Sequence, residues 1–195
     1  MATSSEYLLK TFSDHHQITL VSNDGMNRLT RAKVNSLTEI LQHLTPLPVV
    51  ITGNDKFFSV GADLNEIREL SADAFAFAHL GQKLMNTLAQ FPAPVIAAVS
   101  GFCMGGGLDL ALACRVRVCS PNATFGHRGA SLGIMTGWGG TQRLPRLIGK
   151  SAALQMFVCA QTLSAAEALQ LGLVDQVSEN PVALAGSYAA RCFAR

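Results

Sequence analysis

Hydrophobic residues follow two patterns along this chain. Short apolar or alternating runs predict strands, because successive side chains point to opposite faces of a strand. These runs are residues 6–12, 16–22, 46–53, 93–101, 115–120 and 174–178, and the first two predict a hairpin. Longer segments with apolar side chains three or four positions apart predict helices. They are residues 29–44, 71–91, 105–114 and 181–194, with helical or turn-rich segments at 139–149, 151–160 and 164–174.

Strands and helices alternate along the chain. This order is typical of an α/β protein in which right-handed crossovers join parallel strands. Residues 59–70 predict a loop that enters a helix, and Ser71 is suited to cap the next helix. With 195 residues and no linker, we expect a single domain over residues 1–195. Periodicity leaves open whether the sheet is doubly wound or part of a coil of ββα units.

Composition and charge exclude several classes of protein. The formal net charge is +2 and the basic residues are scattered, which argues against nucleic-acid binding. The uncharged run of residues 90–108 contains two prolines and a glycine triplet, so it favours a buried strand and a turn over a membrane span. The first twelve residues lack the pattern of a signal peptide. The five cysteines show no zinc-ligand spacing, and we expect reduced, buried thiols in a cytoplasmic protein.

Two glycine-rich segments, residues 57–64 and 100–110, lie between a predicted strand and a predicted helix. Glycine lets backbone N–H groups approach a ligand, and a helix N-terminus adds free N–H groups. Two N–H groups that converge on one point would form an oxyanion hole. Each segment alone is equally typical of a tight turn. The second segment lacks the glycine spacing of a dinucleotide site and the Lys-Ser/Thr pair of a phosphate loop.

Four segments together resemble the crotonase, or enoyl-CoA hydratase/isomerase, superfamily. They are residues 51–67, 94–114, 125–156 and 164–177, and the resemblance extends from about residue 17 to residue 178. It implies a crotonase-like spiral of ββα turns whose C-terminal helical trimerisation region is shortened or absent. It also implies an acyl-CoA thioester as the partner, with coenzyme A as part of the substrate, no other cofactor and no metal. A homotrimer or hexamer is the expected assembly.

The resemblance implies roles for individual residues. The backbone N–H groups of Ala62 and Gly106 would hold the thioester carbonyl oxygen, and Asp109 would handle a proton or a water molecule. The other substrate-binding positions would be Val60, Asp63, Leu64, Asn65, Gly105, Gly129 and Leu132, with Gly25 and Met26 near the nucleotide of coenzyme A.

The chain departs from the family where hydratases carry two glutamates, because it has Asp109 and Gly129 at those positions. Asp109 is either catalytic or a carboxylate that stabilises the start of a helix. His127, next to the gap, is a possible acid–base group, although a surface or hydrogen-bonded structural role is favoured. Trp138 replaces a usually small residue, and it either fills the space of the missing glutamate or simply packs.

We therefore predict an enzyme of the enoyl-CoA hydratase/isomerase type, a lyase or isomerase of fatty acid metabolism, which stabilises a thioester enolate. Loss of the second acid favours a one-base reaction, such as isomerisation, thioester hydrolysis or decarboxylation, over hydration. The alternative is a non-catalytic acyl-CoA-binding or regulatory homologue. A carboxylate of Asp109 that points into a pocket favours the enzyme, whereas one that caps the helix or pairs with an outside arginine favours the binder.

Overall fold

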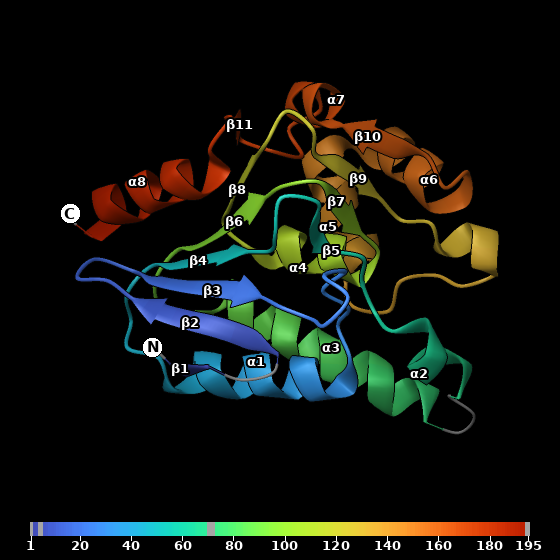
Figure 1. The fold of residues 1–195 in the computed structure, drawn as a ribbon. Coiled ribbons are helices and arrows are strands. Elements are labelled where there is room, and N and C mark those ends of the chain that lie inside the picture. Colours follow the sequence, from blue (N-terminus) through green and yellow to red (C-terminus); the bar gives the residue numbers. More distant parts are fainter. Residues whose placement is uncertain (1, 4–5, 70–72, 194–195) are drawn as a thin grey trace.

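The computed structural model describes residues 2–3, 6–69 and 73–193, and these form two sheets surrounded by helices (Figure 1). The larger sheet has the strand order β1-β2-β3-β4-β6-β8-β11. Its strands are β1 (Ala2–Thr3), β2 (Tyr7–Thr11), β3 (His16–Leu20), β4 (Val49–Thr52), β6 (Val95–Val99), β8 (Val116–Cys119) and β11 (Gln176–Val177). β2 and β3 form the predicted hairpin, and every pairing from β3 to β11 is parallel.

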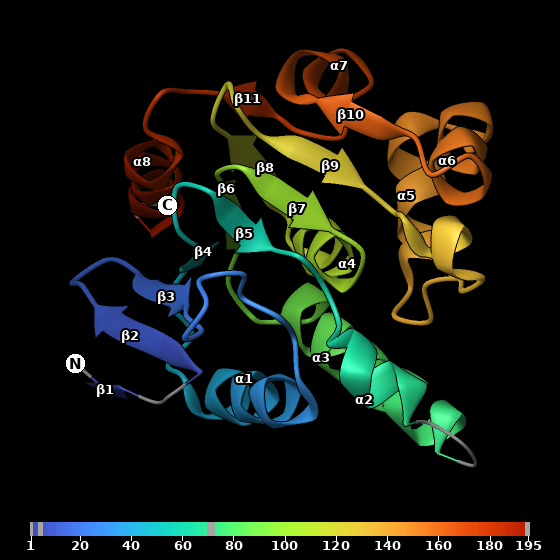
Figure 2. The ribbon, with the colours of Figure 1, turned by 45° about the vertical axis from the view of Figure 1, so that its right-hand side comes forward.

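The smaller sheet has the order β10-β9-β7-β5 and was not predicted. Its strands are β5 (Phe57–Ser59), β7 (Phe102–Met104), β9 (Thr124–Gly126) and β10 (Thr162–Ser164). The sequence analysis took two of these segments for loops or turns, because three residues are too few to display an alternating pattern. Figure 2 shows the four strands side by side, with β5, β7 and β9 parallel and β10 antiparallel to β9.

The two sheets are built by a repeating path of the chain. β4 leads to β5, β6 leads to β7, and β8 leads to β9, so each turn adds one strand to each sheet before a helix follows. The sequence left a doubly wound sheet and a coil of ββα units open, and the structure has the coil. The helices are α1 (Arg31–His43), α2 (Leu64–Arg68), α3 (Ala74–Ala89), α4 (Gly106–Ala113), α5 (Gly140–Ile148), α6 (Lys150–Val158), α7 (Ala165–Gln170) and α8 (Pro181–Phe193), with a 3₁₀ turn, η1, at Gly129–Leu132.

Helices cover both faces of the larger sheet. α8 packs its small Ala185 and Ala189 against one face, on Val50 and Ile96 among others. α1 and α3 lie together on the opposite side of the molecule (Figure 1). Parallel strands covered on both faces read as continuous apolar runs, which explains the uncharged stretch before α4. The expected cap Ser71 lies outside the described residues, and α3 follows Asp73, which makes no side-chain cap hydrogen bond.

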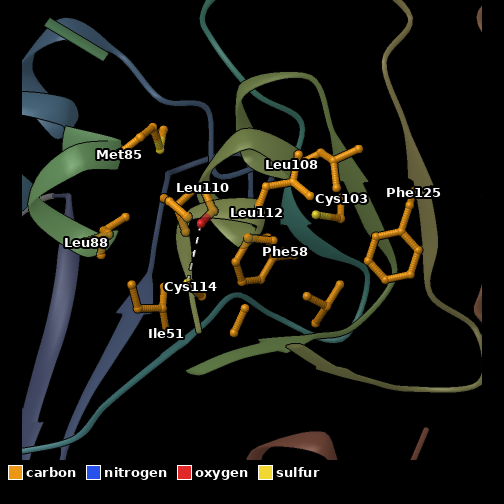
Figure 3. Packing of buried hydrophobic residues seen from close by; sticks show 14 of the residues in the cluster. Ile51, Phe58, Met85, Leu88, Cys103, Leu108, Leu110, Leu112, Cys114 and Phe125 are labelled. Carbon is orange, nitrogen blue, oxygen red and sulfur yellow. Dashed lines mark hydrogen bonds between the residues drawn. The ribbon is translucent and has the colours of Figure 1, made fainter. Parts of the chain in front are cut away.

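α4 runs through the centre of the core and is buried on all sides. Figure 3 shows Phe58 of β5, Cys103 of β7 and Phe125 of β9 packed together beside Leu108 of α4. The run of residues 90–108 therefore forms β6, β7 and the start of α4. None of the described helices has the length and apolar character needed to cross a membrane.

The cysteines only partly match the expectation of buried thiols. All five are free, and Cys103, Cys114 and Cys119 are buried in the core. Cys159 and Cys192 are exposed, so for these two the expectation was wrong. Cys159 follows the last residue of α6, beyond the packed face of that helix.

Candidate active site

Two backbone amides meet where β5 and β7 end. β5 and β7 are parallel neighbours, so the segments that follow them, Gly61–Ala62 and Gly105–Gly106, leave the sheet side by side. A Cβ atom added to Gly61 would lie 2.7 Å from the amide nitrogen of Gly106, and one added to Gly106 would lie 3.2 Å from that of Ala62. Gly61 and Gly105 have φ values of +91° and +52°, which favour glycine. Because Gly106 begins α4, its N–H group has no partner within the helix.

These amides border a pocket of about 490 Å³. Nine of the residues expected at the site line it: Val60, Ala62, Leu64, Gly105, Gly106, Asp109, His127, Gly129 and Leu132. The pocket lies between α2 and α3 on one side and the loop of residues 127–138 on the other. Its other lining is largely apolar, with Ile67, Phe77, Ile134, Met135, Trp138 and Phe157.

Asp109 is fully buried and faces this pocket. It lies one turn after Gly106 on α4, so both residues are on the same face of the helix. Its Oδ2 accepts a hydrogen bond from the hydroxyl of Thr136, and it makes no cap to the helix start, where Gly105 is the N-cap. Burial raises the pKa of Asp109 to about 7, an effect that the Thr136 hydroxyl, the charge of Arg143 and the Gly140 amide offset only in part.

His127 comes directly after β9 and is buried, so of the surface and hydrogen-bonded roles that were favoured, the structure excludes the surface one. Its Nε2 lies 3.4 Å from Oδ1 of Asp109, and its ring packs against Phe157 of α6 at 5.0 Å between centroids. Burial lowers the pKa of His127 to about 4, so its imidazole is neutral at pH 7. The structure thus brings together a protonatable carboxylate and a neutral imidazole that are 18 positions apart in the sequence.

Trp138 packs against glycines of two helices. Its ring lies where a Cβ atom on Gly106 or Gly81 would be, at 2.5 Å and 2.1 Å from the nearest ring atoms. Its Nε1 donates a hydrogen bond to the carbonyl of Phe77 at 3.3 Å. Trp138 therefore forms the wall beside Gly106, and of the two expected roles the structure supports packing. The atoms nearest to position 129 belong to Ile134 instead.

Four of the expected binding residues do not line the pocket: Gly25, Met26, Asp63 and Asn65. Asp63 caps α2 by accepting from the amides of Asn65 and Glu66. Met26 lies against Arg28, whose guanidinium pairs with Asp24 and lies 4.0 Å from Asp63. Arg28 itself lines the pocket, so this group lies at its rim. Thr136 and Phe157 were missed, since nothing in their sequence context links them to Asp109 or His127.

The backbone around Gly129 leaves no room for a glutamate side chain. A Cβ atom on Gly129 would lie 2.5 Å from the carbonyl oxygen of Ile134, whose amide is bonded to the Gly129 carbonyl. We expect Gly129→Glu to be less stable by about 1–3 kcal/mol, because the loop must move, and to gain no enoyl-CoA hydration. Thermal unfolding measures the stability, and the absorbance of an enoyl thioester measures hydration. The control is Ala130→Glu, which introduces a carboxylate in the same turn. Hydration that rises at least tenfold in Gly129→Glu alone would contradict it.

A model of the family described as enoyl-CoA hydratase/isomerase matches residues 15–192. The chain belongs to the enoyl-CoA hydratase/isomerase family. It is 45% identical over 135 residues to the short-chain-enoyl-CoA hydratase of Clostridium acetobutylicum, which covers 68% of this chain and 52% of that protein. The structure of Pseudomonas aeruginosa DspI has a TM-score of 0.94 at 30% identity, covering 100% of this chain and 83% of that one. Bacillus anthracis enoyl-CoA hydratase has a TM-score of 0.85 at 33% identity, covering 95% of this chain and 74% of that one.

These likenesses confirm the crotonase-like fold expected from the sequence. The chain spans about half the length of the curated relatives that it matches, with 52% and 58% of two of them covered. Within the pocket of this family member, Asp109 supplies a carboxylate, whereas position 129 is a glycine.

Proposed function

We propose that this protein is an enzyme that binds an acyl-CoA thioester in the pocket and stabilises the enolate of that thioester. The observation that carries the proposal is the buried carboxylate of Asp109, which lines the same pocket as Ala62 and Gly106. A carboxylate on a pocket wall, one helical turn from two converging amides, is suited to move a proton next to the carbonyl that the amides hold.

The two amides act on the carbonyl oxygen. When a proton leaves the carbon next to a thioester carbonyl, the electron pair of the C–H bond moves into the enolate and negative charge collects on the oxygen. The N–H groups of Ala62 and Gly106 donate to this oxygen, and the positive end of the α4 dipole adds to their effect. One such donor contributes about 3–4 kcal/mol to a transition state.

Asp109 handles the proton in this mechanism. Its pKa of about 7 gives both the carboxylate and the acid near neutral pH. The carboxylate takes the proton from the carbon beside the carbonyl, and the resulting acid returns a proton to the enolate at the same carbon or two carbons further along. The second outcome moves a double bond, and it needs one carboxylate only. Double-bond isomerisation is therefore the reaction that we favour.

The apolar part of the pocket suits the acyl chain. Phe77 and Trp138 line it beside the amides, and Leu132 and Met135 line it at the loop side. Apolar lining with few polar groups is the usual character of a site for a hydrocarbon ligand. The proposed chemistry requires no group beyond this chain and the coenzyme A portion of the substrate.

A non-catalytic acyl-CoA binder is the second candidate, and the absence of a carboxylate at Gly129 favours it. The test uses the wild-type protein with crotonyl-CoA and with a β,γ-unsaturated acyl-CoA of the same length. We expect saturable binding of both, and growth of the conjugated thioester absorbance from the β,γ compound. Loss of absorbance from crotonyl-CoA would instead indicate hydration. Binding without either change would support the binder, and absence of binding would overturn the proposal.

A further inference from the structure

We infer that Asp109 and His127 share one proton and act as a coupled acid–base pair, with His127 as the positioning residue that sets which atom carries the proton. The kinetic consequence of this pair rests on the proposed function, whereas the shared proton itself does not. His127 would thereby tune the acid–base behaviour of the carboxylate of Asp109.

Two buried polar atoms face each other in this pair. Oδ1 of Asp109 and Nε2 of His127 have less than 1 Å² of accessible surface each and no hydrogen-bond partner. They face each other at 3.4 Å. A buried polar atom without a partner costs about 1–3 kcal/mol. A single proton between Oδ1 and Nε2 gives each atom a partner, whether it is carried by the acid form of Asp109 or by Nε2 of the imidazole. An ionised carboxylate opposite an imidazole lone pair leaves both atoms without one.

The surrounding residues hold both side chains in place. The Thr136 hydroxyl donates to Oδ2 of Asp109, which leaves Oδ1 turned toward the imidazole. The ring of Phe157 packs against His127. Position 140 requires a glycine, because a Cβ atom there would lie 2.1 Å from Oδ1 of Asp109 and 3.1 Å from Nε2 of His127.

Other charged and titratable groups also lie around Asp109. Arg143 of α5 acts on it only at a distance, because its guanidinium donates to the Trp138 carbonyl and to Oδ1 of Asn86. Cys103 of β7 is a buried thiol whose pKa is raised well above its usual value, so it stays neutral. His127, in contrast, is a titratable side chain whose Nε2 lies 3.4 Å from a carboxylate oxygen of Asp109.

The proton balance of the pair is simple. In one arrangement the carboxyl O–H of Asp109 donates to Nε2 of His127. When the O–H bond breaks and an N–H bond forms at Nε2, the pair becomes a carboxylate and an imidazolium, and it still holds one proton. A proton taken from substrate carbon by the carboxylate can then be passed to Nε2, which is buried and faces Oδ1 of Asp109. Because the proton returns to substrate through the carboxylate, His127 sets how readily Asp109 takes up and releases it.

A direct test follows the imidazole nitrogens by NMR in protein labelled with ¹⁵N-histidine. The chain has five histidines, and His127→Gln assigns the signals of His127. We expect the Nε2 signal of His127 to shift between its lone-pair and proton-bearing positions in one step near pH 7, together with the ionisation of Asp109. The step should vanish in Asp109→Asn. A signal that does not shift near this pH, or that shifts equally in Asp109→Asn, would overturn the shared proton.

The kinetic test compares His127→Gln with His79→Gln, a matched change at an exposed histidine of α3 outside the pocket. We expect His127→Gln to lower kcat for isomerisation about 10²-fold, to leave KM within about twofold, and to displace the inflection of the pH–rate profile. If His127→Gln lowers kcat equally at every pH, so that the inflection of the pH–rate profile stays in place, His127 has a structural role and the inference is overturned. If the wild type is inactive but the NMR step is present, the proposed function fails and the pair stands.

Discussion

Asp109→Asn is expected to lower turnover of an unsaturated acyl-CoA about 10²–10⁴-fold, the usual loss when an acid–base group is removed. Asparagine keeps the size of the side chain, and its amide oxygen can still accept the hydrogen bond of Thr136. It cannot take up a proton from carbon. The oxyanion amides and the apolar wall are unchanged, so binding of the thioester should stay within about threefold, since the lost interaction belongs to the transition state.

The matched control is Asp73→Asn, which removes a carboxylate at the start of α3 that makes no side-chain cap hydrogen bond. Turnover of Asp73→Asn should equal that of the wild type. Circular dichroism and thermal unfolding establish that Asp109→Asn is folded, and calorimetric titration with a saturated acyl-CoA measures its binding. Turnover of Asp109→Asn within threefold of the wild type would remove Asp109 from the mechanism and leave the amides with a different proton carrier.

The sequence predicted those strands and helices that are long enough to show a periodic pattern of hydrophobic residues. β4 and β6 are buried at every position, and their apolar runs identified them as strands, whereas β8 was identified by its alternating pattern. β5, β7 and β9 are three residues each, and the smaller sheet was therefore missed. This omission matters for function, because it is the pairing of β5 with β7 that places Ala62 beside Gly106.

The residues of the candidate site likewise fall into those that the sequence predicted and those that it did not. Ala62, Gly106 and Asp109 were predicted from motifs near strand ends, and all three line one pocket. For His127 the sequence favoured a surface or hydrogen-bonded structural role, and the structure buries it. Its burial depends on Phe157, some thirty positions later, which covers the ring from α6. A contact made by an element so far along the chain leaves no periodic trace near His127.

The pH dependence of stability gives a second large effect, with opposite signs in two variants. Burial raises the pKa of Asp109 from 3.8 to about 7 and lowers that of His127 from 6.5 to about 4. Between pH 4 and 6.5 the folded protein therefore holds a proton on Asp109, and the unfolded chain holds one on His127. The two states bind equal numbers of protons at these groups, so the pair adds almost no slope to the free energy of unfolding.

When one group of the pair is replaced, the other group alone determines how the free energy of unfolding changes with pH. In Asp109→Asn only His127 is left, whose folded pKa is depressed, so stability is lost as pH falls from 6.5 toward 4. In His127→Gln only Asp109 is left, whose folded pKa is raised, so stability is present at pH 4 and is lost as pH rises toward 7. Relative to wild type, the free energy of unfolding should change with pH by at most about +1.4 kcal/mol per pH unit in Asp109→Asn and about −1.4 kcal/mol per pH unit in His127→Gln.

Urea unfolding of the three proteins across this pH range measures both slopes, and the difference from wild type removes the contribution of all other groups. Opposite slopes would mean that the carboxylate is buried as an acid and the imidazole as a neutral base, the protonation states that a proton-sharing pair requires. Curves parallel to wild type would mean that water reaches both groups in the folded protein. In that case the pocket wall carries an ordinary ionised aspartate at neutral pH, and the acid–base role of His127 would lose its physical basis.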